Sequence, residues 1–210
     1  MSIAQNPLMG PMRKSMGNFT TMSYNVRNII RSKAFNLKRK KTKAQQDQIV
    51  KMTLLAEVYR SFGGITDQGF VENSKGKSAY NLYVSANFNS AFDLTGEVPV
   101  ISYPLLLASK GTLPRVRVSE GVLVSEGIRV IFSSNLSLPY VSESDQIIAF
   151  ARTTDGELRM TIQIRGGEET DSILIPLPDL IVGEVECCYV FARSADGKKS
   201  SNSVYVELIG

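Results

Sequence analysis

The hydrophobic pattern of this chain changes its period once, near residue 98, and this change constrains the fold more than any other feature. Before it, apolar residues recur at three- and four-residue steps, the spacing of one helix face. After it, apolar and polar residues alternate with a period of two in many short runs, the pattern of half-buried strands. Separate helical and strand blocks in one chain predict an α+β protein.

The helical block follows a dense basic run. Thr42 is the predicted N-cap, Gln45 completes a capping box, and Gly63-Gly64 ends the helix. A second helix is expected over Ser78–Phe92, after a loop at 63–77. The two form a helical hairpin spanning residues 42–97. The expected apolar faces are Ile49, Met52, Leu55, Ala56, Tyr59 and Phe62 in the first helix, and Tyr80, Val84, Asn87, Phe88 and Ala91 in the second.

Residues 98–210 are predicted to form an antiparallel β-sandwich, because short strands follow one another at spacings of roughly 8–12 residues. Turn residues separate them, including Asp155-Gly156, Gly166-Gly167 and Asp196-Gly197. The expected strands are Val100–Ala108, Arg115–Val118, Gly121–Val124, Ile128–Ser133, Gln146–Arg152, Leu158–Ile164, Ser172–Leu177, Val185–Arg193 and Ser203–Leu208.

Residues 1–41 are predicted to be a basic, extended arm that contains a β-hairpin. Phe19–Tyr24 favours one strand and Ile29–Ser32 the returning strand. The hairpin is polar and has little to bury, and an isolated hairpin is only marginally stable. It therefore needs a surface, either on its own body or on a neighbouring subunit, and we favour the neighbour.

Charge is distributed unevenly around a net value of +4. Residues 1–46 hold ten Lys or Arg and no acid, whereas residues 47–210 hold fourteen basic and twenty acidic residues. Such an arm suits nucleic acid, an acidic lipid surface, an acidic protein or the body of another copy. The alternative is a solvated linker. The predicted partner-binding set is Phe19, Tyr24, Arg27, Arg31, Lys38, Arg39, Lys40 and Lys41.

We find no pattern for catalysis, a cofactor or a metal, and we predict that the chain is not an enzyme. It contains no His, so His-ligated metal sites and His-based triads are excluded. Cys187 and Cys188 are adjacent and point to opposite faces of a strand, so we expect both to be reduced. Carboxylate pairs at Glu143/Asp145 and Glu168/Glu169 are read as solvated loop residues. We interpret Tyr80, Tyr83 and Phe88 as core residues of a helix and not as aromatic side chains that stack on nucleic-acid bases.

Four short motifs follow one another along the chain: Ile30-Arg31-Ser32-Lys33-Ala34; Thr42 with Ala44, Gln45 and Gln48; Ala79-Tyr80-Asn81; and Ser194-Ala195-Asp196-Gly197-Lys198-Lys199 with Ser201, Ser203 and Tyr205. In this order they resemble an uncharacterised domain family of Bacteroidota and their tailed phages. The opening hairpin differs from the family's usual pattern, because the chain has no Trp and Ala34 stands where Pro is common.

The closing hairpin also resembles that of fibronectin type III domains, which implies an immunoglobulin-like sandwich. This match rests on Leu180, Gly183, Tyr189, Val190, Ala192, Gly197, Ser201, Ser203 and Val206.

Together these likenesses lead us to expect a non-enzymatic structural subunit of a tailed-phage particle, in the neck, the tail or as a capsid decoration. It would be located in the virion, after assembly in the bacterial cytoplasm. Its partners would be other virion proteins and copies of itself, as a homo-oligomer. No apolar run approaches the ~18 residues of a membrane span, so no membrane partner is expected.

Two other functions remain as alternatives. The first is a nucleic-acid-binding or packaging protein that uses the same basic arm on phosphates, with binding that falls steeply as salt rises. The second is a sandwich that binds carbohydrate or a cell surface, for which Tyr140 is the one aromatic loop candidate.

Overall fold

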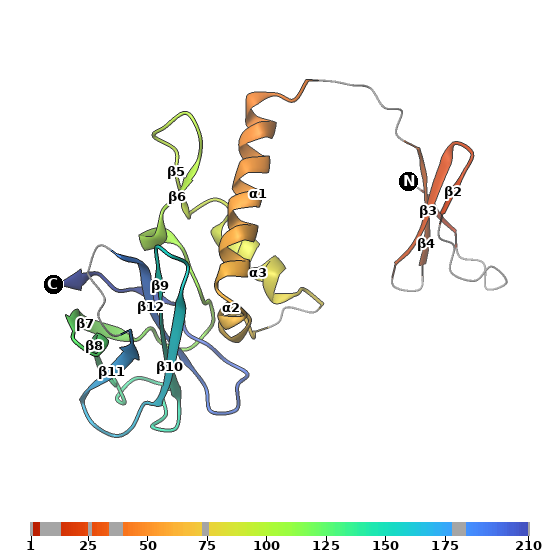
Figure 1. Ribbon diagram of the computed structural model, residues 1–210. Helices are drawn as coiled ribbons and strands as arrows, with labels where there is room; N and C mark the ends of the chain where they lie inside the picture. The colour runs from red at the N-terminus through yellow and green to blue at the C-terminus, as the bar shows by residue number, and fades with distance from the viewer. Residues whose placement is uncertain are drawn as a thin grey trace. The chain divides into compact units, whose positions relative to one another are not determined.

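A computed structural model describes residues 2–4, 14–24, 27–33, 40–72, 76–177 and 184–209. The chain divides into two compact units, residues 1–42 and 43–210 (Figure 1). The N-terminal unit contains a four-stranded antiparallel sheet in the order β1-β4-β3-β2. Its strands are β1 (Ser2–Ala4), β2 (Lys14–Met16), β3 (Phe19–Tyr24) and β4 (Arg27–Ser32).

The N-terminal sheet contains the predicted hairpin and two further strands. The strand at Phe19–Tyr24 is confirmed, and the returning strand starts two residues earlier than expected, at Arg27. The strands β1 and β2 were not predicted, because segments of three residues carry too little alternation to be recognised.

The second unit, which we call the body, is a β-sandwich covered on one side by helices. One sheet has the order β10-β9-β12-β13 and the other β11-β8-β7-β14, and a short ribbon pairs β5 with β6. The strands are β5 (Phe92–Asp93), β6 (Val100–Ile101), β7 (Arg117–Val124), β8 (Gly127–Ser133), β9 (Gln146–Thr153), β10 (Leu158–Ile164), β11 (Thr170–Pro176), β12 (Val185–Arg193), β13 (Val204–Tyr205) and β14 (Leu208–Ile209).

The described residues of the body include three named α-helices and the 3-10 helix η1. They are α1 (Lys43–Ser61), α2 (Ile65–Gly69), α3 (Ala79–Asn87) and η1 (Tyr103–Leu105). Helices α1 and α3 pack beside each other on the outer side of the β9–β12 sheet (Figure 1). The prediction divided this region at residue 97, whereas the structure packs its helices and sheets into one unit. The mixed α+β class and the sandwich are confirmed.

Strands β9 and β12 are buried on both faces, so the body has two cores. Alternate residues of β12 face opposite ways: Cys187, Tyr189 and Phe191 pack against the helices. Cys188, Val190 and Ala192 pack between the two sheets. Both cysteines are free, as expected, and each belongs to a different core. Burial raises the pKa of the Cys187 thiol to about 12, and burial also raises the pKa of Cys188.

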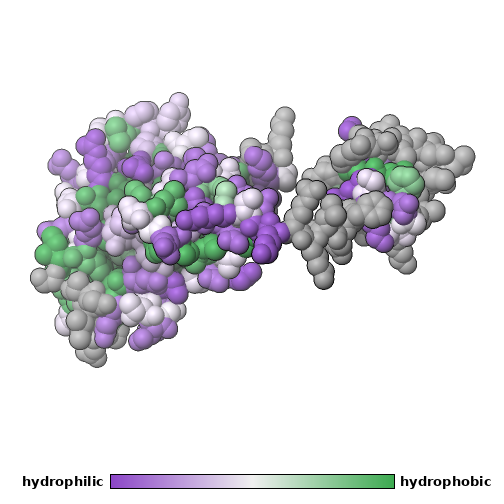
Figure 2. Space-filling model, turned by 90° about the horizontal axis from the view of Figure 1, so that it is seen from above, coloured by the Kyte–Doolittle hydropathy of each residue, from purple (hydrophilic) through white to green (hydrophobic). Residues whose placement is uncertain are grey.

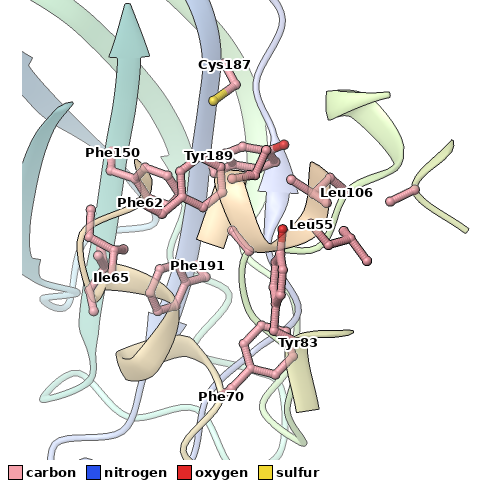
Figure 3. Packing of buried hydrophobic residues seen from close by; sticks show 14 of the residues in the cluster. Leu55, Phe62, Ile65, Phe70, Tyr83, Leu106, Phe150, Cys187, Tyr189 and Phe191 are labelled. Carbon is pink, nitrogen blue, oxygen red and sulfur yellow. The ribbon is translucent and has the colours of Figure 1, made fainter. Parts of the chain in front are cut away.

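The helix-side core is rich in aromatic rings (Figure 3). Phe150 stacks on Tyr189 with ring centres 5.4 Å apart, and Phe62 meets Phe150 edge-on at 5.2 Å. Such aromatic pairs add to the free energy gained from burial alone. Tyr83 is fully buried in this core, which confirms its interpretation as helix core.

The first helix starts directly after the predicted cap and ends at the predicted glycines. Gly63 and Gly64 have positive φ values of 56° and 83°, which favour glycine. The predicted apolar face of this helix is partly wrong. Leu55 and Phe62 are buried as predicted, and so is Val58, but Ile49 and Met52 are 45% and 39% exposed. The N-terminal half of α1 extends past the strands of the sandwich, so its apolar residues have less to cover them (Figure 1).

Three other predictions in the body are wrong in detail. The second helix ends at Asn87 and not at Phe92. There the Asn87 side-chain amide donates to the Leu107 carbonyl oxygen and accepts from the Leu107 N–H. The expected loop at 63–77 contains the short helix α2. The expected strand Val100–Ala108 ends at Ile101 and becomes η1, because Pro104 has no N–H to donate to a strand ladder.

The last expected strand is divided between the two sheets. Residues 204–205 pair with β12 in one sheet, and 208–209 pair in parallel with β7 in the other. In contrast, the expected strands at 115–118 and 121–124 are joined in one strand, β7, which starts at Arg117 and has a register shift between Val118 and Glu120. The bulge interrupts the alternation of a continuous strand, so in the sequence it resembles a break between two strands.

Candidate docking surfaces

The N-terminal sheet has one face that combines cations with apolar side chains. The register pairs Thr20 with Arg31 and Met22 with Ile29, and paired residues share a face. Residues two apart on one strand also share a face. Met22, Arg27, Ile29 and Arg31 therefore lie together, and we call them the cationic face.

The structure separates the predicted partner-binding residues. Arg27 and Arg31 lie together on the cationic face, whereas Phe19, 55% exposed, lies on the opposite face. Lys40 and Lys41 are exposed beyond the sheet. Lys38, Arg39 and the side chain of Tyr24 lie outside the described part of the chain.

This sheet lacks a hydrophobic core of its own among the described side chains. Phe19 and Met22 are exposed, Ile29 and Ile30 are half-buried, and the buried side chains are the polar Thr21 and Asn28. Figure 2 shows hydrophobic and hydrophilic side chains next to each other on the visible face of this unit. A sheet that leaves its apolar residues in water has area available for burial by another surface.

The body has an open groove between α1 and the β5–β6 ribbon. Its volume is about 510 Å³. Val50, Leu54 and Val58 form the helical wall, with Glu57 beside them, and the ribbon forms the other wall with residues 98–101. We call it the helix–ribbon groove. The sequence did not predict it, because Val100 and Ile101 of the ribbon wall were taken for the start of a longer strand and the exposure of Val98 and Val100 follows only from the tertiary structure.

The floor of this groove is a polar network. Arg152 Nη1 lies 2.7 Å from Glu186 Oε2, and the Tyr103 hydroxyl donates to Glu186 Oε1 at 2.6 Å. Burial, then the hydrogen bond to Glu186, raises the pKa of Tyr103. The Tyr189 hydroxyl donates in turn to the carbonyl oxygen of Tyr103 at 2.7 Å. The network holds η1 against the central strands and fixes the shape of the groove.

A β-bulge places Glu186 in this network. Val185 pairs with Thr153 and Cys187 pairs with Arg152, so residue 186 is an extra residue on β12. Because of the bulge, Glu186 reaches the helix side of the sheet where Arg152 and Tyr103 lie. Strict alternation would have put Glu186 on the same face as Cys188, inside the other core.

One acidic loop residue is buried, which corrects its interpretation as solvated. Asp145 and Arg165 are each 3% exposed, and their charged groups lie 3.7 Å apart. Burial lowers the pKa of Arg165, and the nearby Asp145 carboxylate opposes that shift. The pair joins the end of the β8–β9 loop to the end of β10. The described residues include no group of three or more Cys, Asp or Glu side chains that could hold a metal ion.

The closing-hairpin motif has structural roles. Ser201 Oγ accepts from the Ala192 N–H at 2.9 Å, and Ser203 Oγ accepts from the Ala108 N–H at 2.9 Å. Asp196 accepts from the Ser194 hydroxyl and the Lys198 N–H in the turn. The two serines, directly before β13, thus satisfy backbone N–H groups of β12 and of the segment after η1. Leu180 and Gly183 of the fibronectin-like match lie outside the described residues.

The remaining loop candidate, Tyr140, is 78% exposed with a positive φ of 68°. Lys199 Nζ lies 5.4 Å from its ring centre. This places the ring beside the closing turn, but the pocket near this loop is lined by Ser133–Ser137, Gly167 and Glu169, not by Tyr140.

Comparison with protein-family models shows the family to which the chain belongs. Residues 11–207 match a family of unknown function, DUF6266. The chain belongs to this family. No curated protein and no solved structure matches it significantly. Among the helices that the structure describes, none has the length and apolar character needed to cross a membrane.

Proposed function

We propose that this DUF6266 protein is a non-enzymatic structural subunit that assembles through its N-terminal sheet. The observation that carries the proposal is the contrast between that sheet and the body. The described apolar side chains of the sheet remain partly or largely exposed, while the body buries two complete cores without them. A sheet of this kind is stabilised by a surface that covers it.

The proposed setting is a tailed bacteriophage particle, where the subunit would be a neck, tail or capsid-decorating component. The support is the ordered set of four motifs, of which Ile30-Arg31-Ser32-Lys33 lies at the end of the N-terminal sheet. The closing motif has structural roles, whereas the N-terminal motif has exposed side chains at Arg31, Ser32 and Lys33, so it is our candidate for contact with partners. Virion proteins and further copies of this chain are the proposed partners.

We also propose that the sandwich is immunoglobulin-like. The order β7-β8-β11 corresponds to strands A, B and E, and β9, β12 and β13 correspond to C, F and G. Strand β10 extends the second sheet beside C, and β14 pairs in parallel with strand A. A fold of this kind serves many functions and carries no function by itself.

Nucleic-acid binding is the second candidate function, favoured by two exposed arginines on one face of a unit without acids. The body, with fourteen basic and twenty acidic residues over 47–210, would be repelled by phosphates. We therefore rank protein assembly first.

The test compares the solution mass of the full chain with that of residues 43–210. The shorter chain should fold, because it contains every residue of both cores. We expect an oligomer for the full chain and a monomer for the shorter one. Two monomers would refute self-assembly through the sheet, and binding of the full chain to duplex DNA across a salt series would then test the second function.

A further inference from the structure

The helix–ribbon groove presents apolar walls that no described side chain covers. The groove has a volume of about 510 Å³. Val98 and Val100 on its ribbon wall are 56% and 62% exposed. Leu54 and Val50 on the helical wall are half-buried. An exposed apolar surface of this shape is typical of a site that binds a partner.

The charges at this groove select for a cationic occupant. Glu57 lines it and Glu97 lies next to Val98 at its edge, and neither forms an ion pair with any residue that the structure describes. The lining arginine, Arg152, is already paired with Glu186. An occupant with positive charges beside an apolar side chain would therefore meet both the walls and the free carboxylates.

The cationic face of the N-terminal sheet has this composition. Met22 is 49% exposed and lies between Arg27 and Arg31 on one face. Neither arginine forms an ion pair among the described residues. Apolar and charged groups are thus arranged on the sheet as the groove requires.

We infer that the helix–ribbon groove is the acceptor for the cationic face of the N-terminal sheet of a second copy of this chain. Met22 enters the groove between Leu54 and Val100, and the two arginines face Glu57 and Glu97. This inference rests on the proposed function and specifies its contact.

Such a contact joins two different surfaces, so each copy has one donor and one acceptor. A heterologous contact of this type continues from copy to copy and closes into a ring or extends as a filament. Residues 34–42 connect the sheet to α1 and span at most about 30 Å when extended. That length allows the sheet to reach a neighbouring body.

The test uses two full-length variants that are each defective on one side. R27E/R31E removes the donor charges, and V100D places a carboxylate on the acceptor wall. We expect each variant alone to be monomeric, with contact affinity reduced about tenfold or more. Mixed in equal amounts, they should form a 1:1 dimer and nothing larger, because one intact sheet meets one intact groove.

I164D is the matched control. Ile164 is an aliphatic strand residue whose exposed fraction, 65%, is similar to the 62% of Val100. It lies on β10, outside the groove. It should assemble like the unaltered chain. E57K is a second acceptor variant in case V100D lowers the free energy of unfolding. E57K/E97K combined with R27E/R31E should restore assembly, because both charge pairs are then exchanged.

The outcomes separate this inference from the proposed function. If the full chain assembles but V100D and E57K assemble equally well, the groove is not the acceptor and only this inference fails. If the mixed variants remain monomers while the unaltered chain is an oligomer, the contact between copies lies elsewhere. If the unaltered chain is itself a monomer, self-assembly fails and this inference fails with it.

Discussion

The two units of this chain differ in how far they bury their apolar side chains. The body buries strands β9 and β12 on both faces, with helices over one side and a second sheet over the other. The N-terminal sheet has four strands, but its described apolar side chains stay at least partly exposed. Backbone pairing alone adds little stability to a sheet in water, so the difference shows that the body carries the buried cores and that the sheet has apolar area left for the partner surface we propose.

The largest effect should come from emptying the aromatic core of the body. Phe150→Ala removes a fully buried ring that stacks on Tyr189 and meets Phe62. We expect the free energy of unfolding to fall by about 3–5 kcal/mol. Urea unfolding of residues 43–210 measures it, and a loss below about 1 kcal/mol would contradict the two-core description.

A smaller loss should follow removal of a serine at the closing hairpin. Ser201→Ala deletes the oxygen that accepts the Ala192 N–H in a buried position. An unsatisfied buried donor costs about 1–3 kcal/mol. Ser194→Ala, in the exposed turn, is the control and should cost less in the same urea titration.

Alkaline pH should destabilise the body. The pKa of Cys187 rises from its ordinary 9.0 to about 12 because the thiol is buried. Below pH 9 the thiol is protonated in both states, so the folded state loses nothing. Above pH 9 the unfolded thiol ionises and the folded one does not, so stability falls by up to about 1.4 kcal/mol per pH unit for this group. Burial raises the pKa of Cys188 as well, so Cys187→Ala should reduce the decline between pH 9 and 10 without abolishing it. An unchanged slope would assign the decline to Cys188 and the buried tyrosines.

The smallest effect should come from the N-terminal sheet. Phe19→Ser alters a side chain that is 55% exposed and belongs to neither core of the body. The main unfolding transition of the full chain at low protein concentration should shift by less than about 0.5 kcal/mol. A loss comparable to that of Phe150→Ala would show that the two units share a core, and would remove the contrast between them.

The sequence predicted most of what depends on a regular period. The strands at 158–164 and 185–193, the ends of the first helix and the opposite faces of the two cysteines all follow from spacing. The groove, the buried Asp145–Arg165 pair and the division of the last strand depend on contacts between distant segments. Local pattern does not contain such contacts, so tertiary packing decided them.

The single extra residue at position 186 has a consequence for how the chain can vary in length. Because Glu186 is the extra residue of the bulge, its deletion would leave a regular ladder in which Val185 still pairs with Thr153 and faces the inter-sheet core, while residues 187–193 kept their places. Both cores would persist, yet the carboxylate that anchors Tyr103 and Arg152 would be gone. A one-residue deletion could thus erase the floor of the groove from a protein whose scaffold still folds.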